Sequence, residues 1–275
     1  MAGFLKRDLS ACKRFKAKLQ ARELATLVHS SHPAPSLVER LAECGFDAVL
    51  IDAEHGSVGR ERVEEMSRAA ALAGTAAIIR PEACLPHLIT GYLGCGVDGF
   101  MLPLIRNGAQ AQELLRYYRF SAPMDYADRV MIFMIELEEA IDALPDLLRL
   151  DGVDAYLVAP GDLALSMHET PGHTDSMPSL LVQSARVEAA MEKAIRLIVD
   201  AGKTAGIRLD LETIDRYVSQ GVTLLYDHAD NMLLRGAMQF LGEMRNAGQS
   251  TLRARTAPRC VCSHSTAPGV SRGTR

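Results

Sequence analysis

The sequence has no tryptophan, and aromatic residues make up only 5% of its 275 positions. Its core must therefore be aliphatic, since apolar residues still account for 48% of the chain. Aliphatic side chains suit buried parallel strands and the helices that cover them. A chain of this length is long for an average domain but normal for one (β/α)₈ barrel, which needs about 250 residues.

Several kinds of partner have no support in the sequence. The formal charge of −4 favours neither nucleic acid nor an anionic membrane. No apolar run approaches the roughly 20 residues of a membrane span. The six cysteines have no regular spacing, which indicates reduced thiols and a cytoplasmic location. Cys260 and Cys262 form a lone C-x-C motif, which we interpret as incidental rather than as a metal or redox site.

The two ends of the chain differ from the rest. The N-terminal stretch MAGFLKRDLSACKRFKAKL is basic and lacks a long apolar core and a cleavage site. We expect it to form a helix that caps the bottom of a barrel, with a transit peptide or surface anchor as the alternative. After Met244 the chain has no acidic residue and few large apolar ones. We therefore expect residues 1–245 to form a single catalytic barrel domain and residues 246–275 to be a disordered tail.

Strand-like and helix-like patterns alternate from about Leu24 to Gly242. Short apolar runs such as AAIIR are followed by segments such as ERVEEMSRAAALAG, whose apolar residues recur at three- and four-residue spacing. Eight such units predict a (β/α)₈ TIM barrel of the α/β class. An open doubly wound sheet is the alternative. No G-x-G-x-x-G motif follows the first strand, so dinucleotide binding has no support.

Charged residues follow several apolar runs directly, at the carboxyl ends of strands where a barrel carries its chemistry. These ends read Asp52-Ala53-Glu54-His55-Gly56, Arg80-Pro81, Glu136, Ala159-Pro160-Gly161-Asp162 and Asp227-His228-Ala229-Asp230. Glu136 and Asp162 belong to neighbouring strands, and two carboxylates that face one cavity repel each other unless a cation lies between them. Oxygen ligands favour Mg²⁺ or Mn²⁺. The alternative is that both acids only cap helices.

His55 and Arg80 are the other candidates at this end. His55 has acids one and three positions before it, and Asp52 or Glu54 could fix its tautomer or raise its basicity. A structural histidine is the alternative reading. Arg80 closes an apolar run, so its charge would meet an anionic substrate at the barrel mouth. A salt bridge to one of the acids is the alternative for Arg80.

Several segments together resemble the HpcH/HpaI family of class II, metal-dependent pyruvate aldolases. They are FDAVLIDAEHG, AAIIRP, GCGVDGFMLPLI, MIELEEAIDALPDLLRLDGVDAYLVAPGDLALSM and GKTAGI, in order and with similar spacing from Phe15 to Gly242. The combination of D-x-E-H, the glutamate after the fifth strand and P-x-D-L after the sixth is specific, although each motif alone is weak.

This resemblance implies a barrel whose divalent ion, Mg²⁺ or Mn²⁺ with Co²⁺ as an alternative, is held by Glu136 and Asp162. It implies that His55 is the acid and base, that Arg80 contacts the keto acid, and that Pro160 and Gly161 belong to the substrate site. It further implies a homo-oligomer, a trimer or hexamer, in which neighbouring subunits complete the active sites. The implied reaction makes or breaks a carbon–carbon bond of a hydroxy keto acid through a pyruvate enolate, with an aldehyde as the second small molecule.

Three positions depart from the family pattern. A Y-P-P-x-G-x-R-G segment after the fourth helix is missing from RYYRFSAPMDYADRVMIF, and we expect this loss to open the substrate mouth. Met134 stands where a glutamine usually precedes the metal-binding glutamate. Gly94 stands where an acidic residue often reaches a neighbouring subunit's histidine.

Two other functions remain open at this point. An enzyme of the citrate lyase β-chain type would act on acyl-CoA thioesters and would need basic residues near the mouth, for which Arg106, Arg116 and Arg119 are candidates. A degenerate barrel that binds metal without turnover is the third alternative.

Overall fold

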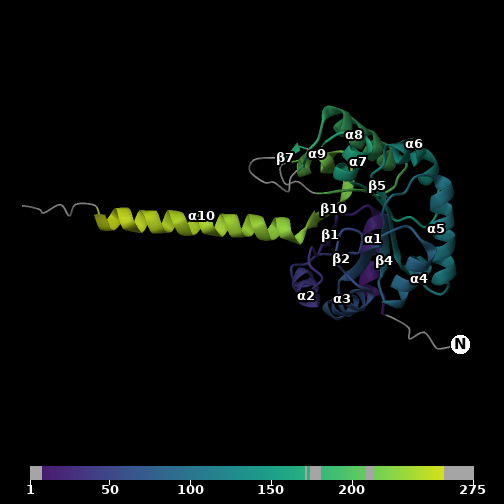
Figure 1. Cartoon of the computed structure of the whole chain (residues 1–275), viewed down its shortest axis with the longest axis horizontal. Helices are drawn as coiled ribbons and strands as arrows, with labels where there is room; N and C mark the ends of the chain where they lie inside the picture. The colour runs from purple at the N-terminus through teal and green to yellow at the C-terminus, as the bar shows by residue number, and fades with distance from the viewer. Residues whose placement is uncertain (1–7, 171, 174–180, 209–212, 257–275) are drawn as a thin grey trace, which may run out of the picture. The chain divides into compact units, whose positions relative to one another are not determined.

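The computed structural model describes residues 8–170, 172–173, 181–208 and 213–256 (Figure 1). The chain divides into two units, Met1–Met232 and Leu233–Arg275, and each is treated by itself. The elements of the first unit run in the order α1 (Ser10–Ala21), β1 (Ala25–His29), α2 (Pro35–Glu43), β2 (Ala48–Asp52), α3 (Arg60–Ala73), β3 (Ala76–Arg80), α4 (Pro86–Gly94), β4 (Gly99–Leu102), α5 (Gly108–Ser121), η1 (Tyr126–Asp128), β5 (Val130–Ile135), α6 (Glu138–Leu147), β6 (Ala155–Val158), α7 (Pro160–Ser166), β7 (Gly172–His173), β8 (Leu181–Val182), α8 (Ala185–Asp200), β9 (Ala205–Arg208), α9 (Ile214–Ser219) and β10 (Val222–His228).

Eight of these strands close into a parallel barrel. Their order around the barrel is β1-β10-β9-β6-β5-β4-β3-β2, while β7 and β8 form a separate antiparallel pair. Helices surround the strands on the outside (Figure 1). The (β/α)₈ prediction is therefore confirmed, and the open doubly wound alternative is wrong, because β1 pairs with both β2 and β10.

Side chains alternate along each strand between the barrel lumen and the outer layer. On β2, Ala48 and Leu50 belong to the inner apolar cluster, whereas Val49 and Ile51 pack with the helices. The same alternation holds on β3 and β5, where the inner residues are Ala76 and Ile78 on one and Val130, Ile132 and Met134 on the other. The lumen is thus filled by aliphatic side chains in its lower layers.

Helix α1 closes the amino-terminal end of the barrel, as expected from its basic amphipathic sequence. Its buried residues Cys12, Phe15 and Leu19 join the inner cluster. Its polar side fastens to the strands, since Lys16 Nζ lies 2.7 Å from Asp154 Oδ1 and donates to the carbonyl of Arg129. One end of the lumen is therefore plugged, which leaves chemistry to the other end.

Helix α10 (Ala229–Thr256) carries the chain into the second unit. The helix includes residues 246–256, which the sequence assigned to the tail, and the division of the chain at residue 245 stays a prediction. Residues 257–275 of the expected tail, including Cys260 and Cys262, lie outside the described residues.

The described part of the chain has no helix long and apolar enough to cross a membrane. The four cysteines within it, Cys12, Cys44, Cys84 and Cys95, are all free thiols.

Candidate active site

A ring of polar side chains lies above the aliphatic lumen, at the carboxyl ends of the strands. Side chains two residues apart on a strand face the same side. Three members of this ring, Asp52, Arg80 and Glu136, therefore face inward, because each comes two residues after an inward-facing side chain (Leu50, Ile78 and Met134). The same step from Leu27 and Tyr226 leads to His29 and His228. Asp52, Arg80 and Glu136, the three members of this ring that the sequence predicted, are buried. Charged residues buried at this end of a barrel are typical of an active site.

Asp52 and Arg80 form the best-defined contact of the ring. The guanidinium donates from Nε to Asp52 Oδ1 at 2.8 Å and from Nη2 to Asp52 Oδ2 at 2.7 Å. Burial alone would raise the pKa of Asp52, but the hydrogen bonds from Arg80 and His29 outweigh it and hold that pKa well below its usual value. The pair therefore stays ionised, and this bidentate geometry fixes the plane of the guanidinium.

His55 lies in the loop after β2, with an exposed ring that contacts Arg80. Arg80 Nη2 is 2.9 Å from His55 Nδ1. Because arginine can only donate, Nδ1 must be the acceptor, and the neutral ring carries its proton on Nε2. Asp52 meets His55 at the backbone, where its Oδ1 accepts from the His55 amide at 3.4 Å. The side-chain contact that sets the tautomer thus comes from Arg80.

Glu54 lies near both Arg80 and His55, and one of its carboxylate oxygens has no hydrogen-bond partner. Its Oε2 is 3.2 Å from Arg80 Nε and 3.6 Å from His55 Nδ1, close enough for ion pairing, yet it accepts no hydrogen bond. Burial raises the pKa of Glu54, and the charges of Asp52 and Asp162 act in the same direction.

Glu136 follows β5 and is almost completely buried, with 1% of its surface exposed. Its Oε1 accepts a hydrogen bond from the amide of Leu104 at 2.5 Å, whereas its Oε2 has no partner. Leu104 has a φ of +53°, an uncommon conformation for a residue other than glycine, and this turn presents its amide to the carboxylate. Burial, together with the charges of Asp162 and Glu54, raises the pKa of Glu136 to about 7.

Asp162 lies in the first turn of α7, after Pro160 and Gly161, and all three residues are half-buried. Its charge acts on both Glu136 and Glu54. Three carboxylates therefore influence one another at the ends of β2, β5 and β6. Such an arrangement is costly unless a proton or a cation neutralises part of the charge.

His29 and His228 were given no role from the sequence. His29 Nε2 lies 3.2 Å from Asp52 Oδ2, and the two imidazole rings contact each other with centroids 4.4 Å apart and planes tilted by 54°. Tyr226 places its hydroxyl 3.3 Å from His228 Nε2. Burial and the neighbouring positive groups lower the pKa of His228 to about 3, so its ring is neutral. The signal that would have revealed both histidines is their two-residue spacing from inward-facing residues of β1 and β10.

The three family departures lie in different places. Met134 faces the lumen, with its sulfur 4.0 Å from Arg80 Nη1. Gly94 ends α4 at an exposed position where an added Cβ would meet no atom within 4 Å. The short α5–β5 connection, with η1, lies at the amino end of β5, opposite the polar ring. The expected effect of its shortness on the substrate mouth stays a prediction.

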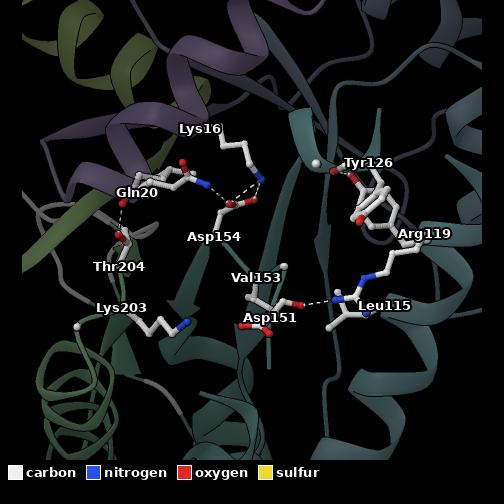
Figure 2. A pocket seen from close by; sticks show the side chains of 15 residues that line it. Lys16, Gln20, Leu115, Arg119, Tyr126, Asp151, Val153, Asp154, Lys203 and Thr204 are labelled. Carbon is white, nitrogen blue, oxygen red and sulfur yellow. Dashed lines mark hydrogen bonds and ion pairs between the residues drawn. The ribbon is translucent and has the colours of Figure 1, made fainter. Parts of the chain in front are cut away.

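A cavity with a volume of about 570 Å³ lies at the opposite end of the barrel (Figure 2). Its lining includes Asp154 and Thr204, which directly precede β6 and β9. Figure 2 shows Lys16 and Gln20 meeting Asp154, whose oxygens also accept the amide of Met131. These polar groups fasten α1 to the barrel, so this cavity is not our candidate site.

Comparison with known proteins points to one family. Residues 26–225 match the model of the HpcH/HpaI aldolase/citrate lyase family. The hydroxypyruvate/pyruvate aldolase of Cupriavidus necator is 29% identical over 253 residues, which cover 82% of this chain and 90% of that protein. The 4-hydroxy-2-oxo-heptane-1,7-dioate aldolase of Klebsiella pneumoniae is 31% identical over 224 residues, covering 72% of this chain and 81% of that protein.

Solved structures also resemble this chain. An HpcH/HpaI aldolase/citrate lyase family protein of Burkholderia cenocepacia superposes with a TM-score of 0.74 at 25% identity, covering 85% of this chain and 99% of that one. The citrate synthase SbnG superposes with a TM-score of 0.73 at 22% identity, covering 88% of this chain and all of that one, and this likeness concerns the fold alone.

Proposed function

The chain belongs to the HpcH/HpaI aldolase/citrate lyase family, and we propose that it is a metal-dependent aldolase that makes or breaks a carbon–carbon bond of a hydroxy keto acid. The observation that carries the proposal is the state of Glu136. A buried carboxylate oxygen without a hydrogen-bond partner, close to two further acids, has the character of an unfilled ligand.

The residues fit a hard divalent ion such as Mg²⁺ or Mn²⁺, with Co²⁺ as an alternative. Glu136 and Asp162 would hold it, since carboxylate oxygens are the ligands that these ions prefer. Within the described residues there is no group of three or more His, Cys, Asp and Glu arranged to hold a metal, so the protein itself would supply only part of the coordination. A bound divalent ion would polarise a keto carbonyl and offset negative charge as it develops on the keto oxygen.

The contacts of Arg80 support a role in binding the keto acid. Its Nε and Nη2 are taken by Asp52, while Nη1 points to Met134 Sδ at 4.0 Å, a weak acceptor that an anionic oxygen would replace. Asp52 keeps the guanidinium rigid, so little entropy is lost when the substrate binds. We assign Arg80 to binding the keto acid and to stabilising the developing negative charge.

His55 would handle the proton. With Nδ1 occupied by Arg80, the neutral ring presents its N–H from Nε2. In the cleavage direction the ring would take the proton of the C4 hydroxyl at Nδ1, which requires its contact with Arg80 to loosen. The bond between C3 and C4 then breaks to release the aldehyde, its electron pair forms the pyruvate enolate, and the imidazolium returns a proton to C3 from Nε2. In the condensation direction the same ring would first take a proton from C3 of pyruvate and would later return one to the aldehyde oxygen.

The oligomer is the other part of the proposal. Helix α10 carries exposed apolar residues at three- and four-residue spacing: Leu233, Leu234, Met238, Phe240, Leu241 and Met244. An exposed apolar face on a helix is typical of a surface that another protein covers. A homo-oligomer, as a trimer or a hexamer, would bury it, and would also bring Gly94 of one subunit near another subunit's mouth if the family arrangement holds.

The acyl-CoA alternative gains nothing from the structure. Arg106 pairs with Glu139, Arg116 lies over the ring of Tyr117, and Arg119 donates to the carbonyl of Asp151 beside the cavity at the far end of the barrel. None of these three arginines is thereby directed at the polar ring. The degenerate barrel is distinguished from the aldolase only by turnover.

Incubation with pyruvate in deuterated water tests the proposed function without knowledge of the aldehyde. We expect proton NMR to show loss of the pyruvate methyl signal when Mn²⁺ is present, at an Mn²⁺ concentration low enough to leave that signal detectable. After chelation of Mn²⁺ we expect no loss of the signal. Metal binding without exchange would support the degenerate barrel instead. Exchange that survives chelation would refute the metal-dependent mechanism.

A further inference from the structure

His29 occupies a buried place beside the proposed chemistry without a part in it. It ends β1, with 8% of its surface exposed, and the residues below it on the lumen side are Leu27 and Ala25. An apolar residue would continue this wall at no cost. A buried imidazole instead requires hydrogen-bond partners for its nitrogens.

Both nitrogens of His29 have such partners. Nε2 lies 3.2 Å from Asp52 Oδ2, and Nδ1 lies 3.4 Å from Ser31 Oγ. Ser31 has a φ of +59°, a conformation uncommon for serine, in the turn that brings its hydroxyl back to the ring. Ser31 Oγ accepts from the amide of Asp230 and can donate its proton to Nδ1. Nε2 then carries the ring proton and donates it to Asp52.

Asp52 passes this contact on to the rest of the site. Its two oxygens accept from Arg80, and Oδ1 also accepts from the amide of Glu54 at 3.1 Å. Arg80 in turn contacts His55 Nδ1 at 2.9 Å. An unbroken series of polar contacts thus runs from β1 through Asp52 and Arg80 to the proposed proton donor.

We infer that His29 is a positioning residue, which holds Asp52 in the orientation that aligns Arg80 with the keto acid and with His55. It touches none of the reacting atoms itself. The kinetic part of this inference rests on the proposed aldolase function, whereas its structural part, the effect of His29 on the ring of His55, does not.

Two variants separate hydrogen bonding from packing. His29→Gln retains an N–H donor with a similar reach, and His29→Leu removes the donor but fills much of the space. We expect His29→Leu to lower kcat/KM for Mn²⁺-dependent deuterium exchange into pyruvate by about tenfold or more, because small displacements of positioning groups are costly. His29→Gln should remain close to the parent. If His29→Leu does not fold, His29→Asn takes its place, since its shorter amide leaves the donor out of reach of Asp52.

A measurement without turnover completes the test. In protein with ¹⁵N-labelled histidine, NMR should show His55 Nδ1 as the unprotonated nitrogen in the parent and in His29→Gln, and should show a changed signal in His29→Leu. If the parent exchanges no deuterium while these signals behave as expected, the aldolase proposal fails and the inference stands. Equal exchange and equal His55 signals in all three proteins would overturn the inference. So would a His29→Gln variant that loses as much as His29→Leu, because the donor would then not be the cause.

Discussion

Glu136 offers a way to examine the proposed metal site through measurements of stability. Its pKa of about 7 in the folded, metal-free chain means that the buried carboxylate is costly whenever it is ionised. Glu136→Gln replaces it by a neutral side chain of nearly the same shape, whose oxygen can still accept the amide of Leu104. We expect this substitution of a proposed ligand to stabilise the metal-free protein at alkaline pH.

The magnitude follows from the pKa. The difference between the usual value of 4.5 and about 7, at about 1.4 kcal/mol for each pKa unit, corresponds to about 3 kcal/mol. Glu136 is 1% exposed, so solvent screening reduces this little. The glutamine amide would have no partner where Oε2 lies, at a cost of about 1 kcal/mol. The net gain is about 2 kcal/mol, or roughly 4–8 °C in melting temperature for a chain of this size.

The direction of the pH effect is fixed by linkage. A carboxyl group with a raised pKa binds its proton more tightly in the folded state, so its contribution to stability is full below about pH 4.5 and is lost as the pH rises to about 7. Glutamine does not titrate. The metal-free variant should therefore have no advantage at pH 5 and should melt higher than the parent at pH 8. Differential scanning calorimetry of chelated protein at the two pH values measures this.

Addition of Mn²⁺ at pH 8 should reverse the order, because the ion binds the parent and stabilises it by about 2.7 kcal/mol at a hundredfold excess over its Kd. The variant should gain little. Glu139→Gln is the matched control, since Glu139 is an exposed acid paired with Arg106 and its loss should change stability by less than about 0.5 kcal/mol. The reasoning is refuted if Glu136→Gln destabilises the chelated protein at pH 8, or if Mn²⁺ stabilises parent and variant alike.

Three further predictions concern His55, Gly94 and α10. His55→Ala should slow deuterium exchange by about 10²–10⁴ while Mn²⁺ affinity stays the same, and exchange at the parental rate would make this histidine structural. Gly94→Asp has room for its side chain and should move the basic limb of the exchange pH profile upward by favouring imidazolium on a neighbouring subunit; an unchanged profile would contradict that placement. Replacing both Phe240 and Met244 by Glu should shift light scattering toward smaller species, unless the apolar face of α10 is not an interface.

Much of the fold could be predicted because it depends on periodicity. The eight apolar runs and the intervening helices follow from spacing alone, and so does the capping helix at the amino end. The positions of Asp52, Arg80 and Glu136 in the ring follow too, because each comes two residues after an inward-facing side chain.

The contacts among the polar side chains at the barrel mouth could not be predicted from the sequence, since they depend on which strands meet and how long each side chain is. The sequence placed Asp52 and Glu54 near His55 along the chain, yet the side chain that reaches the ring of His55 is Arg80, from the next strand. His29 and Asp52 are 23 positions apart and become neighbours only through the barrel.

The claim that Glu136 and Asp162 hold a divalent ion is tested most directly by Mn²⁺ titration followed by electron paramagnetic resonance. The parent should bind one Mn²⁺ per chain, with affinity reduced at least about a hundredfold in Glu136→Gln and in Asp162→Asn and unchanged in Glu139→Gln, because a lost anionic ligand costs several kcal/mol. Equal Mn²⁺ affinity in the parent and in both ligand variants would contradict the account.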